Sequence, residues 1–159
     1  MRYVFTNGSA CFSIQFWSNG FRISDGYWNT AKMMYPKPAN AQYFADKLPA
    51  GETRTHNIAA KRVGTSLLVY IDGTHTFTFS VDKGLEWAPG VTGGEGYPAN
   101  ANAIKELYAS VFGTEGSEIA IGFRCSLMNE SGSYINKTGF TNIILTDKAD
   151  LISSFNGKF

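Results

Sequence analysis

The chain has few cysteines, few histidines and little net charge: two Cys, two His and a formal charge of +1 in 159 residues. Cys11 and Cys125 are too few for a disulfide framework and lack the spacing of metal ligands. We expect buried free thiols, with a bridge between them as the alternative. No basic run exceeds the pair Lys61-Arg62. Because a phosphate backbone attracts clustered basic side chains, we predict no nucleic-acid partner.

Long apolar runs are also missing. No segment approaches the ~20 apolar residues of a membrane span, so membrane insertion is not expected. Residues 1–17, MRYVFTNGSACFSIQFW, contain no apolar stretch of signal-peptide length. We therefore expect the protein to act where it is made or to leave the cell by a route that needs no signal. Removal of a leader is the alternative.

Glycine and aromatic residues are plentiful, at 17 glycines and 14% aromatics. The glycines separate short apolar runs, as they do in all-β chains with many turns. A chain of this length can bury roughly 70% of its unfolded surface in one core. We expect residues 1–159 to form a single all-β domain.

Several segments have the period-two alternation of half-buried strands. Residues 11–18 alternate apolar and polar side chains and then meet Asn19-Gly20, a dipeptide that favours a hairpin with the next segment. Residues 25–48 contain two prolines that exclude a central strand and favour a loop, followed by a short helical stripe. The segments with a strand pattern are 11–18, 21–24, 52–63, 67–71, 76–81, 118–127 and 140–147.

The stretch RVGTSLLVYIDGTHTFTFS, residues 62–80, shows the clearest pair of strands. Residues 67–71 are apolar at every position, so we expect this strand to be covered on both faces and to lie centrally in its sheet. Asp72-Gly73 favours a turn. Residues 76–81 alternate Phe or Val with Thr or Ser, which predicts one buried face and one hydroxyl-lined face.

One helix is expected to interrupt the strands. The apolar residues from 104 to 112 recur at helical spacing, Asn102 can cap the start, and Gly113 can end the helix. The glycine-rich residues before Asn102 are expected to form a loop. We predict a short helix over residues 102–112.

The order of these pieces resembles that of concanavalin A-like and laminin G-like domains. In residues 48–73 a turn, a His-bearing strand, an Arg-Val-Gly turn and a Tyr-x-Asp-Gly hairpin follow one another, as in those domains. CFSIQFW is similar to their early strand, EIAIGFR to a late strand, and GFTNIILTD to the closing strand, which runs antiparallel to an earlier one. The resemblance implies a two-sheet antiparallel β-sandwich, the concanavalin-like jelly roll, which agrees with the alternating strands.

The sequence departs from that family in two places. Thr55 precedes His56 where such domains often carry Trp, and the predicted helix is not part of the family pattern. We therefore carry over no binding site. Sandwiches of this kind include glycan-binding proteins and glycoside hydrolases, so the function has to be argued from a site.

Hydrolysis of a glycosidic bond needs two carboxylates, separated by roughly 5 Å or by 6.5 to 9.5 Å. The Glu-x-Asp-x-x-Glu strand of the related hydrolases is absent. The seven glutamates lie mostly in turns, at strand ends or on the helix, and only Glu118 clearly enters a predicted strand. We predict that the protein is not an enzyme, with a glycoside hydrolase as the less favoured reading.

The histidines and aspartates favour structural roles. His56 and His75 lie on different predicted strands without neighbouring cysteines, which favours structural hydrogen bonds over catalysis or metal binding. We predict no cofactor. Calcium is the alternative, because Asp25, Asp72 and Asp82 could offer oxygen ligands at turns. An Asp before Gly in a hairpin is, however, first a turn residue.

A carbohydrate site needs exposed aromatic rings beside small polar groups, because sugars present C–H faces to rings and hydroxyls to amides and carboxylates. Two predicted loops have this chemistry. The candidate ligand-binding residues are Asp25, Tyr27, Trp28, Asn29, Tyr35, Trp87, Tyr97 and Asn100. The alternative is that Trp28 and Trp87 plug the ends of the sandwich.

These features predict a recognition or adhesion module that binds cell-surface carbohydrate. A lectin-like domain without an export signal would also fit a virion protein released on lysis, such as a phage fibre, adhesin or capsid decoration protein. Such a protein would act through contacts with other virion proteins or as a homo-oligomer. We expect an extracellular or virion-associated location.

Replacing Trp28 by Ala is expected to abolish carbohydrate binding without unfolding the protein, because the ring would supply the stacking surface. A glycan array measures the binding, and circular dichroism checks the fold. A variant that fails to fold would show that Trp28 is a core residue.

Overall fold

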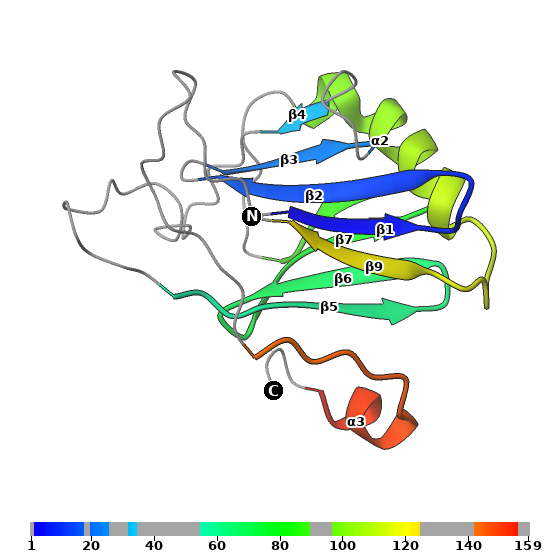
Figure 1. Cartoon of the computed structure of the whole chain (residues 1–159). Coiled ribbons are helices and arrows are strands. Elements are labelled where there is room, and N and C mark those ends of the chain that lie inside the picture. Colours follow the sequence, from blue (N-terminus) through cyan, green and yellow to red (C-terminus); the bar gives the residue numbers. More distant parts are fainter. Residues whose placement is uncertain are drawn as a thin grey trace.

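The computed structural model describes residues 2–17, 20–25, 32–34, 55–89, 97–124 and 142–155. The elements are β1 Arg2–Thr6, β2 Cys11–Trp17, β3 Gly20–Ser24, β4 Lys32–Met34, β5 Ile58–Val63, β6 Ser66–Ile71, β7 Thr74–Ser80, β8 Gly84–Trp87, α2 Tyr97–Phe112, β9 Ala120–Arg124 and α3 Ala149–Ser154. The strands form two antiparallel sheets (Figure 1). We call β4-β3-β2-β1-β9 the first sheet and β5-β6-β7-β8 the second sheet. The predicted all-β sandwich of two antiparallel sheets is confirmed.

Most neighbouring strands in each sheet are also neighbours in the sequence. The predicted hairpin between β2 and β3 forms, with Trp17 opposite Gly20. Strand β9 is the exception, because it returns the chain to the first sheet and pairs with β1, Val4 opposite Gly122. A jelly roll has Greek-key connections between strands that are not sequence neighbours. Among the described strands, β1 and β9 are the one pair of this kind.

Two tight turns set the register of the second sheet. Asp72 and Gly73 both have positive φ, 51° and 82°, as a type I′ turn between β6 and β7 requires. Gly64 has φ 57° at the first position of the β5–β6 turn, the place where a type II′ turn needs glycine. Strand β6 lies between β5 and β7. The predicted hairpin and the predicted central position of this strand are both confirmed, while its outward side chains Leu68 and Tyr70 are half-buried.

Both sheets and helix α2 contribute to one hydrophobic core. Phe12 of the first sheet meets Phe79 of the second, with ring centroids 4.9 Å apart. Tyr108 of α2 stacks on Phe112 at 4.7 Å and on Phe79 at 5.7 Å. The buried core residues are Phe5, Phe12, Ile14, Phe16, Ile23, Leu67, Val69, Ile71, Phe77, Phe79, Leu85, Ile104, Tyr108, Val111 and Phe112. The helix is therefore part of the sandwich interior.

Helix α2 begins earlier than predicted. It starts at Tyr97 rather than at Asn102, so the end of the predicted glycine-rich loop is helical. Pro98 permits this because backbone N–H groups in the first helical turn have no partner within the helix. The predicted end is confirmed, since Gly113 follows the last helical residue and its N–H donates to Ala109 O at 2.9 Å.

The first sheet differs from the predictions at two points. Residues 32–34, expected to lie in a loop, form strand β4 at the sheet edge, paired with β3; the nearby prolines exclude a central strand but not an edge strand. Cys11 is a free thiol and is half-buried rather than buried. Cys125 and the helical stripe expected after the prolines lie outside the described residues.

The predicted closing strand is wrong in its described part. Residues 142–148 form no strand, and Ile143, Ile144 and Leu145 are exposed. In Figure 1 residues 142–155 lie beyond β5, outside the two sheets. An alternating pattern indicates which face of a segment would be buried. A strand forms, however, only where a neighbouring strand pairs with the segment. Among the described residues, no helix is long and apolar enough to cross a membrane.

The hydroxyl of Tyr108 joins the helix to the second sheet by donating a hydrogen bond to Thr65 O at 2.7 Å. Burial raises the pKa of Tyr108 far above its ordinary value, an effect that the charge of Arg62 partly offsets. The folded state therefore favours the neutral phenol. The stability that the neutral phenol gives the folded protein is complete below the pKa of about 10 that tyrosine has in the unfolded chain. This stability is lost as the pH rises further.

Replacing Tyr108 by Phe is expected to lower the free energy of unfolding at neutral pH by about 0.5–1.5 kcal/mol, because one hydrogen bond is lost. Above pH 10 the difference between wild type and variant should shrink, since only the wild type has to keep Tyr108 protonated. Urea unfolding from pH 7 to pH 11 measures both effects. The half-buried Tyr70→Phe is the control, and parallel profiles for wild type and Tyr108→Phe would contradict the expectation.

Candidate functional site

Of the eight predicted ligand-binding residues, four belong to the described part of the chain. Tyr27, Trp28, Asn29 and Tyr35 lie outside the described residues, so their roles stay predictions. Asp25 is half-buried and directly follows Ser24, the last residue of β3.

Trp87 ends β8 and contacts the core. Its indole ring lies 5.9 Å from the Phe77 ring at 81° and packs against the buried cluster. This contact favours the alternative interpretation, in which Trp87 plugs the sandwich. Tyr97 and Asn100 lie at the start of α2 and not in a loop as predicted.

Asp25 and Trp87 lie toward opposite ends of the sandwich. Strand β3 runs toward the β1–β2 turn, because Ser24 pairs with Ser13 near the start of β2. Strand β8 runs away from the β7–β8 turn, because Trp87 pairs with Phe77. Both turns lie at one end of the sandwich. Asn7 of the β1–β2 turn donates to Ser110 O of helix α2, and Tyr108 of the same helix donates to Thr65 O of the β5–β6 turn. The β7–β8 turn lies at the same end as the β5–β6 turn, because β6 and β7 are antiparallel and Leu67 pairs with Phe79. The structure therefore does not bring these two candidates together.

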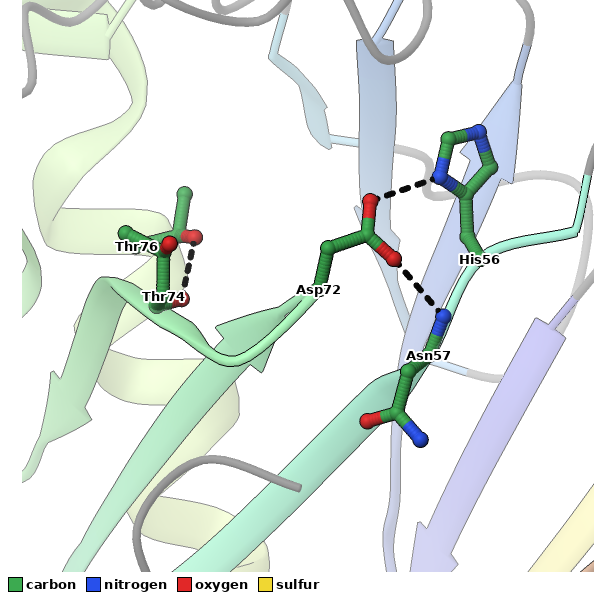
Figure 2. A network of polar contacts seen from close by, with 5 residues as sticks. All are labelled: His56, Asn57, Asp72, Thr74 and Thr76. Atoms are coloured by element: carbon green, nitrogen blue, oxygen red, sulfur yellow. Dashed lines mark hydrogen bonds and ion pairs between the residues drawn. The ribbon is translucent and has the colours of Figure 1, made fainter.

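Asp72 organises a polar network at the other end of the second sheet (Figure 2). One carboxylate oxygen lies 2.8 Å from His56 Nδ1, and the other accepts the Asn57 N–H at 2.9 Å. The Asp72 N–H also donates to Asn57 O at 2.7 Å. The carboxylate thus ties the β6–β7 turn to the residues that lead into β5.

This network has a structural explanation. Asp72 occupies a positive-φ turn position that Asp tolerates better than most residues, and both of its oxygens bind groups at the start of β5. His75 is also hydrogen-bonded, with Nε2 2.9 Å from Thr78 Oγ1. Both histidines are hydrogen-bonded, as predicted.

Carboxylates, imidazoles and thiols in the described part of the chain do not gather in groups of three or more that could hold a metal ion. Calcium binding through Asp25 or Asp82 stays a prediction.

A β-bulge in β7 changes which side chains share a face. The register shifts so that Val69 pairs with Phe77 while Tyr70 pairs with His75, leaving Thr76 as the extra residue. Thr76 is therefore buried beside Phe77, and its hydroxyl donates to Thr74 O at 3.0 Å. The predicted hydroxyl face included Thr76, and this is wrong because a bulge breaks the strict alternation.

The bulge places His75 on the same outward face as Thr78. The His75 ring lies 5.2 Å from the Tyr70 ring, and Phe155 packs edge-on against Tyr70 at 5.1 Å. All four side chains are half-buried. We call Tyr70, His75, Thr78 and Phe155 the outer aromatic face. Sequence reasoning missed it, although the Thr and Ser residues at every second position from 74 to 80 indicated a polar surface there.

Part of the outward face of the first sheet is buried. Arg2, Ser13, Gln15 and Ser24 alternate with core residues and so point away from the core, yet all four are buried. Arg2 Nη2 donates to Gln15 Oε1 at 2.8 Å, and the hydroxyls of Ser13 and Ser24 lie 2.6 Å apart. Among the described surfaces, the second sheet therefore offers the more accessible outward face.

Glu118, the one glutamate expected in a strand, is exposed and precedes β9, which begins at Ala120. The strand starts there because Ala120 faces Thr6, the last residue of β1.

No protein-family model, no curated protein and no solved structure matches the chain.

Replacing Asp72 by Ala is expected to lower the free energy of unfolding by about 2–4 kcal/mol, because both carboxylate bonds are lost and Ala is strained at positive φ. Asp72→Asn keeps one acceptor and tolerates the turn, so its cost should be smaller. Urea denaturation measures both, with the exposed turn variant Asp82→Ala as control. Equal stabilities of Asp72→Ala and Asp82→Ala would show that the network does not hold the turn.

Proposed function

We propose that the protein is a non-catalytic recognition or adhesion module that binds carbohydrate on the outer aromatic face of the second sheet. The observation that carries the proposal is the adjacency of the Tyr70 ring, the His75 ring and the Thr78 hydroxyl on one half-exposed sheet face. The predicted loop at residues 25–35 is the alternative location for the same activity.

The chemistry of this face matches what a sugar presents. A pyranose packs its C–H groups on an aromatic ring and directs its hydroxyls to polar groups at the ring edge. Tyr70 supplies a ring with a phenolic hydroxyl, while the His75–Thr78 pair supplies a donor and an acceptor. Both groups stand on adjacent, hydrogen-bonded strands, so the surface is preorganised.

Two described carboxylates have roles within the scaffold, which supports binding rather than hydrolysis. Asp72 uses both oxygens to hold the start of β5. Glu86 accepts a hydrogen bond from Lys83 at 2.9 Å on the exposed surface. A glycosidase needs its two carboxylates directed at the scissile bond, whereas these two already have partners.

Replacing Tyr70 by Leu is expected to weaken oligosaccharide binding roughly tenfold, because the aromatic stacking surface is lost. Tyr70→Phe keeps the ring and is the matched control, with most of the affinity retained. A glycan array identifies the ligand, and calorimetry with that oligosaccharide measures the affinities.

The Trp28→Ala variant decides between the two locations. If Tyr70→Leu binds like wild type while Trp28→Ala does not bind, the site is the loop at residues 25–35. If no glycan binds the wild-type protein, the carbohydrate proposal fails altogether.

A second candidate function is assembly through protein contacts, as in a virion structural protein. The observation that favours it is the run of exposed aliphatic side chains Ile143, Ile144 and Leu145. Large exposed apolar surface marks interaction sites, whereas single exposed apolar residues are normal on monomers.

A further inference from the structure

The outward face of the second sheet is built from rows of side chains that cross its strands. Paired residues on neighbouring antiparallel strands direct their side chains to the same face. Lys61 pairs with Leu68, and Leu68 pairs with Thr78, which gives one outward row. Tyr70 and His75 belong to the neighbouring outward row. Lys61 therefore stands next to the residues proposed to bind carbohydrate.

The C-terminal segment contacts both of these rows. Lys61 Nζ donates to Ile152 O at 2.7 Å. This carbonyl belongs to the last turn of α3, where a helix leaves C=O groups that need partners outside the helix. The Phe155 ring meets the Tyr70 ring at 88°, with centroids 5.1 Å apart. Rings at this distance are in contact, so Phe155 covers part of the ring on which a sugar would stack.

The segment that makes these contacts is exposed and short. Residues 142–145, 147–151 and 154 are exposed. Helix α3 has six residues, and its N-cap residue Lys148 makes no side-chain cap hydrogen bond. A helix of this length is not stable by itself in water. We therefore attribute the position of α3 to its contacts with the rest of the protein.

Helix α2 shows the contrast between a core helix and a peripheral one. Tyr108 and Phe112 of α2 are fully buried between the two sheets. On α3, Leu151 is exposed and Ile152 is half-buried. Segments with few buried apolar contacts open locally at a low free-energy cost, while the core stays folded. Detachment of α3 would leave the aromatic core intact.

We propose that residues 149–155 form a lid over Tyr70, which opens to admit the ligand while the two sheets stay folded. A sugar that packs on Tyr70 needs ring surface that Phe155 covers, so the closed lid and a bound sugar compete. The apparent affinity then falls in proportion to the fraction of molecules whose lid is open. The inference rests on the proposed carbohydrate site for its ligand, but the lid itself can be tested without one.

Two variants open the lid from different sides. Phe155→Ala removes the ring from Tyr70. Lys61→Met removes the ammonium group that holds Ile152 O and keeps an unbranched side chain at this position. The matched control is Leu151→Ala, which shortens an exposed apolar side chain of the same helix. Circular dichroism checks the fold of each variant.

Two measurements test the lid without a ligand. Hydroxyl-radical footprinting with mass spectrometry measures the exposure of Tyr70, and we expect roughly twofold faster oxidation in Phe155→Ala and Lys61→Met but not in Leu151→Ala. Hydrogen exchange measures opening in the wild type. The Ile152 amide, which donates to Lys148 O at 3.0 Å, should exchange at least roughly 100-fold faster than the amides of β6.

Unchanged Tyr70 oxidation in both variants would overturn the proposal. Equal exchange rates for Ile152 and β6 would also overturn it, because the segment would then open only when the whole domain unfolds.

Calorimetry with the oligosaccharide that the glycan array selects tests the effect of the lid on binding. We expect Phe155→Ala to bind about two- to tenfold more tightly than the wild type, and Leu151→Ala to bind like the wild type. Weaker binding by Phe155→Ala would show that the ring is a wall of the site and would refute the lid.

The Tyr70→Leu variant separates the lid from the carbohydrate proposal. If Tyr70→Leu weakens binding while Phe155→Ala leaves it unchanged, the lid alone is refuted. If both variants bind like the wild type, the ligand binds elsewhere and neither proposal holds for this face. If no glycan binds the wild type, the carbohydrate proposal fails, and footprinting and hydrogen exchange alone decide whether the segment is a lid.

Discussion

Aromatic contacts between the two sheets and helix α2 are the constraint on which the rest of the structure depends. Phe12 meets Phe79 across the sandwich, and Tyr108 and Phe112 stack beside them. Buried rings of this size each contribute about 3–5 kcal/mol relative to Ala. These contacts fill the space between the two sheets. A ligand could therefore contact only the outer faces, the edges and the turns.

The two outward sheet faces differ because of their polar side chains. On the first sheet, Arg2 and Gln15 are buried and bonded to each other. On the second sheet, His75 and Thr78 remain half-exposed beside Tyr70. The bulge at Thr76 contributes His75 to the second of these faces, because it turns that side chain to the outside. Bulges commonly re-aim side chains next to functional sites, which agrees with a binding role for this face.

Residues of the C-terminal segment contact the outer side of the second sheet. Lys61 of β5 donates a hydrogen bond to Ile152 O, and Phe155 packs edge-on against Tyr70. The outer aromatic face is therefore built from two strands and from a segment more than 70 residues later in the sequence.

The sequence by itself determined the features that depend on local chemistry. The apolar run at residues 67–71 indicated an internal strand, and Asp72-Gly73 indicated its turn, because alternation and positive φ are properties of adjacent residues. Only the tertiary structure decided which segments with a strand pattern pair with a neighbouring strand. Residues 142–148 have the pattern of a strand and remain outside the sheets. The bulge at Thr76 and the burial of Arg2 were likewise set by the pairing and packing of strands. The start of α2 at Tyr97 follows a local rule instead, because the first helical turn tolerates proline.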